Sequence, residues 1–166
     1  MPYGGLTIGS PSTFNPLLGG RPPATYLGEL LRASNASCAL EALNIKEIPF
    51  EHVNGNCLGF ARERSIFINP VNPMPHKTRF HELAHVLLGH SAEGQQADSE
   101  ITPRNQRECE AELVALLCCA ALDLPGVAEC RGYIQNWWGQ GNPIPERSAQ
   151  KILKTADQIL KAGGRS

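Results

Sequence analysis

Residues 76–88, which lie between Pro75 and Gly89, constrain the fold of this chain more than any other segment. Proline is favoured in the first turn of a helix and glycine just past its end, so this punctuation predicts a helix over these residues. Most of the segment is apolar, which indicates a helix that is largely buried. It nevertheless carries His81 and His85. Because buried polar groups need partners, neighbouring elements must supply groups that bind these two side chains.

The two histidines are spaced as metal ligands on a helix would be. Residues four apart lie on one helical face, so His81 and His85 project two imidazoles from the same side, as a zinc ion requires of its first two ligands. Glu82 is rotated by about 100° from His81, which places its carboxylate beside the metal, where it can act as a general base. The alternative is a surface helix with two incidental histidines, and the apolar residues around them favour the metal site.

A third metal ligand has to come from outside residues 81–85. A pattern that supplies a third histidine would need glycine at position 88 and histidine at position 91, and this chain has Leu88 and Ser91 there. His90 lies on a different face, just past Gly89. We expect His90 at the surface or behind a ligand rather than on the metal.

A later predicted helix offers three glutamates instead. Glu108 and Glu112 are four residues apart and share a face. That face continues with small residues that allow close approach of another helix, namely Ala111, Ala115 and Cys119. Glu110 points about 200° away from Glu108. We therefore assign Glu108 as the third ligand and Glu112 as the carboxylate that orients a ligating histidine. The alternative for all three is interaction with the helix dipole, which suits Glu110.

The whole chain is predicted to be α+β. Residues 1–23 are rich in Gly, Pro, Ser and Asn and indicate a flexible N-terminal arm, and residues 24–166 are expected to form one domain. Short antiparallel strands are predicted within residues 45–53, 57–61 and 65–69. Besides the helix over residues 76–88, we predict one helix before the sheet, over residues 24–43. Three more helices are predicted later in the chain, over residues 103–122, 127–138 and 146–162. Thr102 is the predicted N-cap of the helix over residues 103–122.

Charge and cysteine usage exclude several classes of protein. Fifteen basic and sixteen acidic residues give a net charge of −1, which is no electrostatic footprint for nucleic acid, and we interpret Lys151, Lys154 and Lys161 as a solvated helix face. The six cysteines lack C-x-x-C spacing, which favours free, buried thiols. No secretory signal and no apolar run near the roughly 20 residues of a membrane span occur. We expect a cytoplasmic protein without membrane contact.

The run HELAHVLLGH and the later pattern E-x-x-A-E-x-x-A resemble the gluzincin type of zincin. Within that type the chain is similar to the ImmA/IrrE metallopeptidases and to the metallopeptidase domain of ArdC-type antirestriction proteins, from about Gly55 onward. The resemblance implies a zincin-like fold and Zn²⁺ held by His81, His85 and Glu108, with Glu82 as the catalytic carboxylate. Many relatives have Asn or Asp where this chain has Glu112, which is a departure.

The resemblance also indicates a function. It implies a zinc-dependent endopeptidase whose substrate is a regulatory protein, such as a helix-turn-helix repressor. Tyr133 is a candidate oxyanion donor, although most aromatic residues of a late helix belong to the core. The alternative function is a catalytically silent, zinc-containing antirestriction or regulatory binding protein. A nucleic-acid-associated role is a third, weaker idea: the segment before the sheet is too short for the DNA-binding domain of ArdC-type proteins, so direct binding is not inferred. His52 and His76 are expected at the surface.

Overall fold

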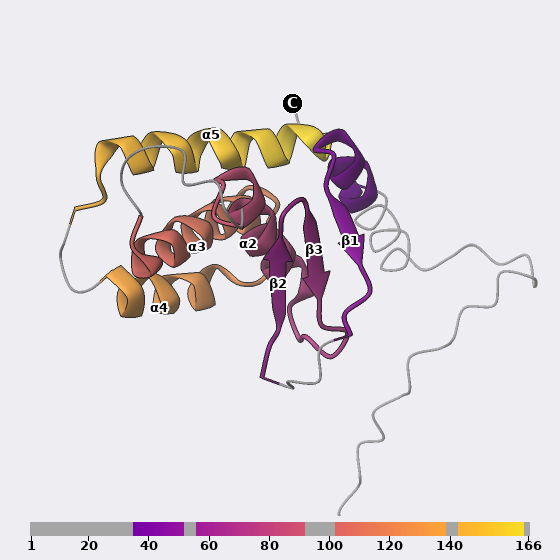
Figure 1. Cartoon of the computed structure of the whole chain (residues 1–166). Helices are drawn as coiled ribbons and strands as arrows, with labels where there is room; N and C mark the ends of the chain where they lie inside the picture. Colours follow the sequence, from indigo (N-terminus) through magenta and orange to yellow (C-terminus); the bar gives the residue numbers. More distant parts are fainter. Residues whose placement is uncertain (1–34, 52–55, 92–101, 139–142, 165–166) are drawn as a thin grey trace, which may run out of the picture. The chain divides into compact units, whose positions relative to one another are not determined.

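The structure is a computed structural model that describes residues 35–51, 56–91, 102–138 and 143–164. The predicted α+β class is confirmed: a small sheet precedes four helices in the chain (Figure 1). A helical segment over residues 35–42 leads into the sheet. The predicted boundary between an arm and a domain, at residues 23 and 24, lies outside the described residues.

The sheet has three strands in the order β1-β3-β2, which are β1 (Lys46–Ile48), β3 (Ser65–Ile68) and β2 (Gly59–Arg62). A tight turn at Glu63, whose φ is 50°, joins β2 to β3 as an antiparallel hairpin. The rings of Phe60 and Phe67 stack across this pair, with centroids 4.3 Å apart. Such cross-strand pairs stabilise the register of a hairpin.

The prediction of an antiparallel sheet was wrong for β1, which pairs with β3 in parallel. Parallel neighbours need a long connection, and residues 49–64, which include β2, provide it. The Arg64 guanidinium donates to the carbonyl oxygens of Leu43 and Asn44 and so holds the chain that enters β1 against the hairpin turn. This contact between distant residues lies next to the parallel pairing of Lys46 with Ser65 and supports it.

The helices agree closely with their predicted bounds, and they are α2 (Pro75–Leu87), α3 (Arg104–Ala121), α4 (Val127–Trp138) and α5 (Glu146–Ala162). The predicted cap of α3 was wrong: Pro103, not Thr102, occupies the N-cap position and makes no side-chain cap hydrogen bond. The fixed φ of proline favours this boundary without a capping hydroxyl. Gly89 adopts a φ of 77° just past α2, as its predicted stop requires.

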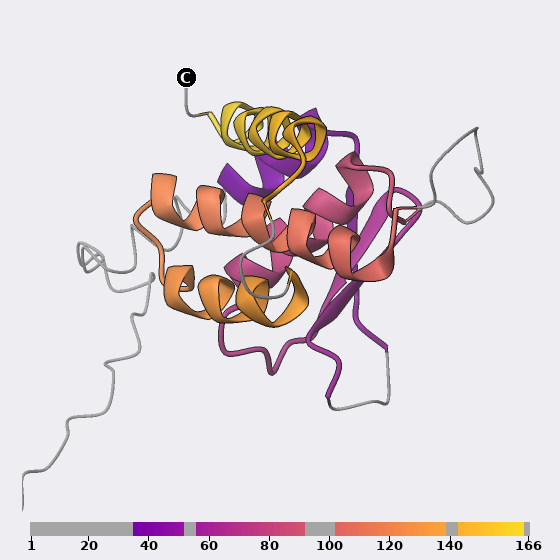
Figure 2. The same cartoon turned by 90° about the vertical axis from the view of Figure 1, so that its left-hand side faces the viewer.

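Helix α3 lies between α4 and α5 and also packs against α2 (Figures 1 and 2). Its buried face includes small residues, and Ala111, Ala115, Cys118 and Cys119 are almost fully inaccessible. Small side chains let helix axes approach closely, so α2 and α3 meet near the position of the histidines. Leu83 of α2 and Ile152 of α5 complete the core with Ile66 of the sheet.

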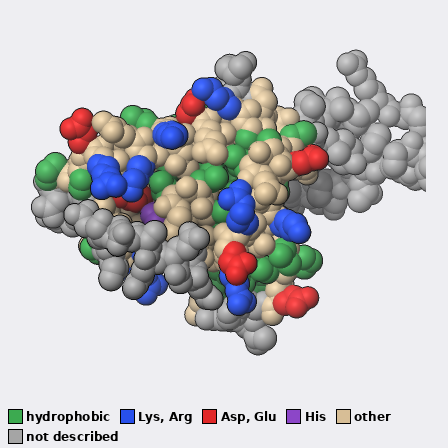
Figure 3. Space-filling model, turned by 45° about the horizontal axis from the view of Figure 1, so that its top comes forward, with side chains coloured by type: hydrophobic (Ala, Val, Ile, Leu, Met, Phe, Trp, Pro, Cys, Tyr) green, Lys and Arg blue, Asp and Glu red, His purple; other side chains and the backbone are tan. Residues whose placement is uncertain are grey.

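The charged surface follows the sequence prediction, and so do the thiols except for Cys38, which is exposed, and Cys57, which is partly buried. Lys151, Lys154 and Lys161 are exposed, and in Figure 3 basic and acidic side chains are interspersed over the visible face. All six cysteines are free, and Cys109, Cys118, Cys119 and Cys130 are buried. Burial raises the pKa of the Cys109 thiol to about 11, so these thiols stay protonated at neutral pH. None of the described helices is long and apolar enough to cross a membrane.

Candidate metal centre

Helix α2 brings two imidazoles together because His81 and His85 are one turn apart. Their Nε2 atoms lie 3.1 Å from each other, and the ring centroids are 4.7 Å apart. Each side chain retains a small accessible fraction, so the two nitrogens face a solvent-accessible space rather than the core. The predicted i, i+4 pair is therefore formed locally by the helix.

Helix α3 adds a carboxylate to the pair. Oε2 of Glu108 lies 3.4 Å from Nε2 of His81 and 3.6 Å from Nε2 of His85. Among the described residues these three side chains form a group able to hold a metal ion. In tetrahedral coordination at the usual zinc distances, ligand atoms are about 3.3 Å apart. The three separations match this value, so the donor set fits zinc without rearrangement.

The electrostatics of the trio also favour a cation. Burial lowers the pKa of His81, but the hydrogen bonds to Glu108 and Glu112 outweigh it and raise that pKa from 6.5 to about 9. Hydrogen bonds from His81 and His85 hold the pKa of Glu108 well below its ordinary value. In the metal-free protein His81 therefore stays protonated near neutral pH. Its positive charge lies among the same three side chains that could hold a metal ion.

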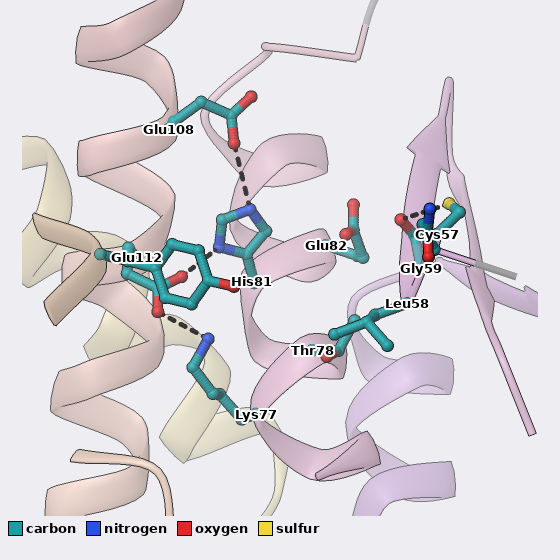
Figure 4. A pocket seen from close by; sticks show the side chains of 11 residues that line it. Cys57, Leu58, Gly59, Lys77, Thr78, His81, Glu82, Glu108 and Glu112 are labelled. Atoms are coloured by element: carbon teal, nitrogen blue, oxygen red, sulfur yellow. Dashed lines mark hydrogen bonds and ion pairs between the residues drawn. The ribbon is translucent and has the colours of Figure 1, made fainter. Parts of the chain in front are cut away.

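Behind His81 lies the carboxylate that was predicted to orient it. Glu112 accepts a hydrogen bond from His81 Nδ1 at 2.8 Å, and its other oxygen lies 2.6 Å from Lys77 Nζ (Figure 4). Although burial opposes ionisation, the bonds from His81 and Lys77 lower the pKa of Glu112. An ionised Glu112 requires the proton of His81 on Nδ1, which leaves Nε2 free to bind a metal.

Glu82 lies on the side of α2 that faces the segment from Cys57 to Gly59, whereas His81 points toward α3 (Figure 4). The residue is only 6% exposed. Burial is the main reason that its pKa is raised to about 7, partly opposed by the charge of His81. A carboxyl group with this pKa can both accept and return a proton near neutral pH.

A cavity of about 340 Å³ opens over these groups. Its lining includes Leu58, Gly59 and Thr78 on one side and Tyr133 on α4. The expectation that Tyr133 is a core residue was wrong: it is 51% exposed, and its ring lies over Lys77 Nζ at 5.0 Å. Although α4 packs extensively against α3, Tyr133 lies on the part of α4 that lines the cavity.

Glu110 lies apart from the trio, as its helical angle predicted, but the dipole interpretation of this residue was wrong. Its buried carboxylate lies 3.1 Å from His90 Nε2 and accepts a bond from Ser148 Oγ at 2.6 Å. Burial opposes ionisation, yet these bonds and one from Gln106 lower the pKa of Glu110 to about 2. Sequence analysis missed this pair because the contact depends on a turn at Gly89. The turn signal, a glycine followed by a histidine, was present.

Of the two histidines expected at the surface, the structure describes His76 alone. His76 binds the carbonyl oxygen of Pro125 at 2.7 Å through Nε2, away from the trio. His52 lies outside the described residues.

Comparison with known proteins assigns the chain to a protein family. The model of the family described as the IrrE N-terminal-like domain, a peptidase family, matches residues 39–126, which is more than half of the chain. The match spans β1 to α3 and includes the trio, whereas Tyr133 and Ser148 lie beyond it. No significant match was found among curated proteins or among solved structures.

Proposed function

The chain belongs to the family of IrrE N-terminal-like domains, a metallopeptidase-type family that implies a metal and a protein substrate, and from this premise we propose that it is a zinc-dependent endopeptidase. The predicted resemblance to ImmA/IrrE metallopeptidases is thereby confirmed. The observation that carries the proposal is the convergence of three donor atoms, from His81, His85 and Glu108, beside a buried carboxylate.

The donor set supports zinc in a catalytic role. Two imidazole nitrogens and one carboxylate are three protein ligands, and catalytic zinc sites keep the fourth position open for water or substrate. When bound, zinc polarises the scissile carbonyl and lowers the pKa of a water molecule. The cavity beside the trio provides the access that such a site needs.

Glu82 is the proposed general base. Its carboxylate takes a proton from the attacking water and then donates it to the nitrogen of the leaving amine. A pKa of about 7, caused mainly by burial, suits both steps near neutral pH. Tyr133, a half-exposed residue, lines the same cavity, and we propose that its hydroxyl donates to the oxygen that becomes negative during attack.

The cavity suits an extended peptide. Gly59 begins β2, an edge strand of the sheet, and residues 57–59 line the cavity next to Glu82. An extended segment can dock beside an edge strand through backbone hydrogen bonds. The proposed substrate is a regulatory protein, such as a helix-turn-helix repressor, as the resemblance to ImmA/IrrE metallopeptidases implies, and the proposed compartment is the cytoplasm.

Cleavage of the repressor encoded nearest to this chain in its genome tests the proposal. The zinc-loaded protein should cleave it, Glu82→Gln should bind zinc without cleaving, and Glu108→Ala should purify with little zinc. Glu129→Gln, at an exposed position on α4, is the matched control and should behave as wild type. Equal cleavage by wild type and Glu82→Gln would exclude the mechanism. An unchanged biological effect with Glu82→Gln would instead favour the catalytically silent binding protein.

A further inference from the structure

A second chain of buried polar groups extends from His85 on the side away from the trio. His85 Nδ1 lies 3.2 Å from His90 Nδ1, and His90 Nε2 lies 3.1 Å from Glu110 Oε2. The His90 and Glu110 side chains are 7% and 5% exposed, so water does not compete for these contacts. His85 thus contacts the other two members of the trio through Nε2 and His90 through Nδ1.

The end of α2 places His90 there. Gly89, with φ at 77°, turns the chain back, the Gly89 N–H donates to the carbonyl oxygen of Val86, and the His90 N–H donates to that of His85. These two bonds define a Schellman motif, in which the second residue past the helix cap packs against the residue five before it. Here both residues are histidines, so the motif brings the two imidazoles into an edge-to-face arrangement with ring centroids 5.3 Å apart.

Glu110 is held firmly from the far side. Its Oε1 accepts from Ser148 Oγ at 2.6 Å and from Gln106 Nε2 at 3.0 Å. Ser148 belongs to the first turn of α5, which lies outside the family match. The carboxylate is therefore a fixed acceptor, and its free Oε2 faces His90.

We propose that His90, held by Glu110, is a positioning residue that fixes the tautomer and ring orientation of His85 for metal binding. The inference rests on the proposed function, because it assumes that His85 binds the metal through Nε2. A neutral His85 bound in this way carries its proton on Nδ1, and His90 Nδ1 must then accept that proton as a hydrogen bond. His90 in turn carries its proton on Nε2 and donates it to Glu110.

The two ligating histidines are thus oriented by different routes. Glu112 orients His81 directly, whereas Glu110 orients His85 through a second imidazole. An orienting partner of a ligating histidine contributes about tenfold to a hundredfold in metal affinity. The competing explanation is that His90 and Glu110 only tie the end of α2 to α3 and α5.

Two substitutions separate these explanations. In His90→Asn the amide oxygen takes the place of Nδ1 and can still accept from His85, while the contact with Glu110 is lost. In His90→Gln the amide nitrogen takes the place of Nε2 and can still donate to Glu110, while the contact with His85 is lost. His76→Asn, in the first turn of α2, where the imidazole contacts the carbonyl oxygen of Pro125 and not the trio, is the matched control.

The measurement is zinc affinity, by competition with a chromophoric chelator, together with unfolding of the metal-free protein in urea. We expect His90→Asn to bind zinc within a few-fold of wild type and His90→Gln to bind about tenfold or more weakly. Equal affinities, or the reverse order, would overturn the proposal in favour of a structural tie. Should His90→Gln fail to fold, His90→Ala, which removes the acceptor for His85 Nδ1, must weaken zinc binding by about tenfold relative to His90→Asn or the proposal is overturned. A wild-type protein that binds no zinc would refute the proposed metal site itself, which is a different failure.

Discussion

Replacing Glu112 by glutamine tests two effects of one buried carboxylate: its ion pair with Lys77 and its hydrogen bond from His81. One of its oxygens lies 2.6 Å from Lys77 Nζ and the other 2.8 Å from His81 Nδ1. The Lys77 and Glu112 side chains are 11% and 4% exposed. A glutamine amide has a single acceptor oxygen, and its NH₂ group must face one of the two donors. Glu112→Gln therefore leaves the Lys77 ammonium buried without a counter-ion.

Removing one partner of a buried ion pair costs about 3–5 kcal/mol, because the other charge is left uncompensated. The ring of Tyr133, 5.0 Å from Lys77 Nζ, continues to stabilise the ammonium in the variant. We therefore expect the lower end of the range, a loss of roughly 3 kcal/mol in the free energy of unfolding of the metal-free protein. Zinc affinity should fall by about tenfold to a hundredfold, because His81 loses the carboxylate that orients it.

Adding Lys77→Met to Glu112→Gln removes the uncompensated charge. The double variant should recover most of the unfolding free energy, measured in urea with a chelator present, while its zinc affinity stays low. If zinc affinity returned together with stability, weak folding would explain the loss, and the orienting role of Glu112 would be refuted. If Glu112→Gln unfolded like wild type, the buried ion pair would contribute nothing to stability.

Two further predictions concern packing and pH. A Cβ at Gly59 would lie 2.6 Å from Thr78 Cγ2 and 2.9 Å from the Phe67 carbonyl oxygen, so Gly59→Ala should cost about 1–3 kcal/mol in urea unfolding. Gly132→Ala, on α4 with open space around it, should instead stabilise by about 0.5–1 kcal/mol, and equal effects of the two variants would contradict the steric argument. The pKa of His81 is raised from 6.5 to about 9, so its stabilisation of the metal-free protein is fully present below pH 6.5 and is lost as pH rises through 9. At about 1.36 kcal/mol per pKa unit this is a decline of roughly 3 kcal/mol, and an unchanged decline in His81→Gln would assign it to other groups.

The parts of the fold that the sequence predicted are those set by nearby residues. Helix α5 has the predicted bounds because Pro145 and Gly163 limit a strongly amphipathic stretch. The direction of β1 was not predictable, because an alternating pattern is the same in parallel and antiparallel strands. It is accompanied by a tertiary contact that no local pattern reveals, between Arg64 and the carbonyl oxygens of Leu43 and Asn44, about twenty residues away in the chain.

The same distinction applies to the candidate site. The pairing of His81 with His85 follows from helical geometry alone, and the stripe of small residues on α3 indicated which glutamate approaches them. The partner of Glu110 was not predictable in this way, because it depends on how the chain turns after α2 and on where Ser148 of α5 packs. Burial of Glu110 was likewise a tertiary effect.

The arrangement of α3 links metal binding to folding. Glu108 and Glu112 on one face and Glu110 on another all reach toward the two imidazoles of α2, directly or through His90. Without a cation, several carboxylates lie close together around few positive charges: hydrogen bonds to Glu108 and Glu112 raise the pKa of His81, and the same two carboxylates add to the effect of burial in raising the pKa of Glu82. A divalent ion that binds only the folded chain removes this repulsion and stabilises the fold by about 4 kcal/mol at a thousand times its dissociation constant. The contact between α2 and α3 is therefore both part of the core of the domain and the support of the proposed metal site. Substitutions at the site should change stability and zinc affinity together. The exception is a variant such as Glu112→Gln with Lys77→Met, in which the charge balance is restored and only zinc affinity falls.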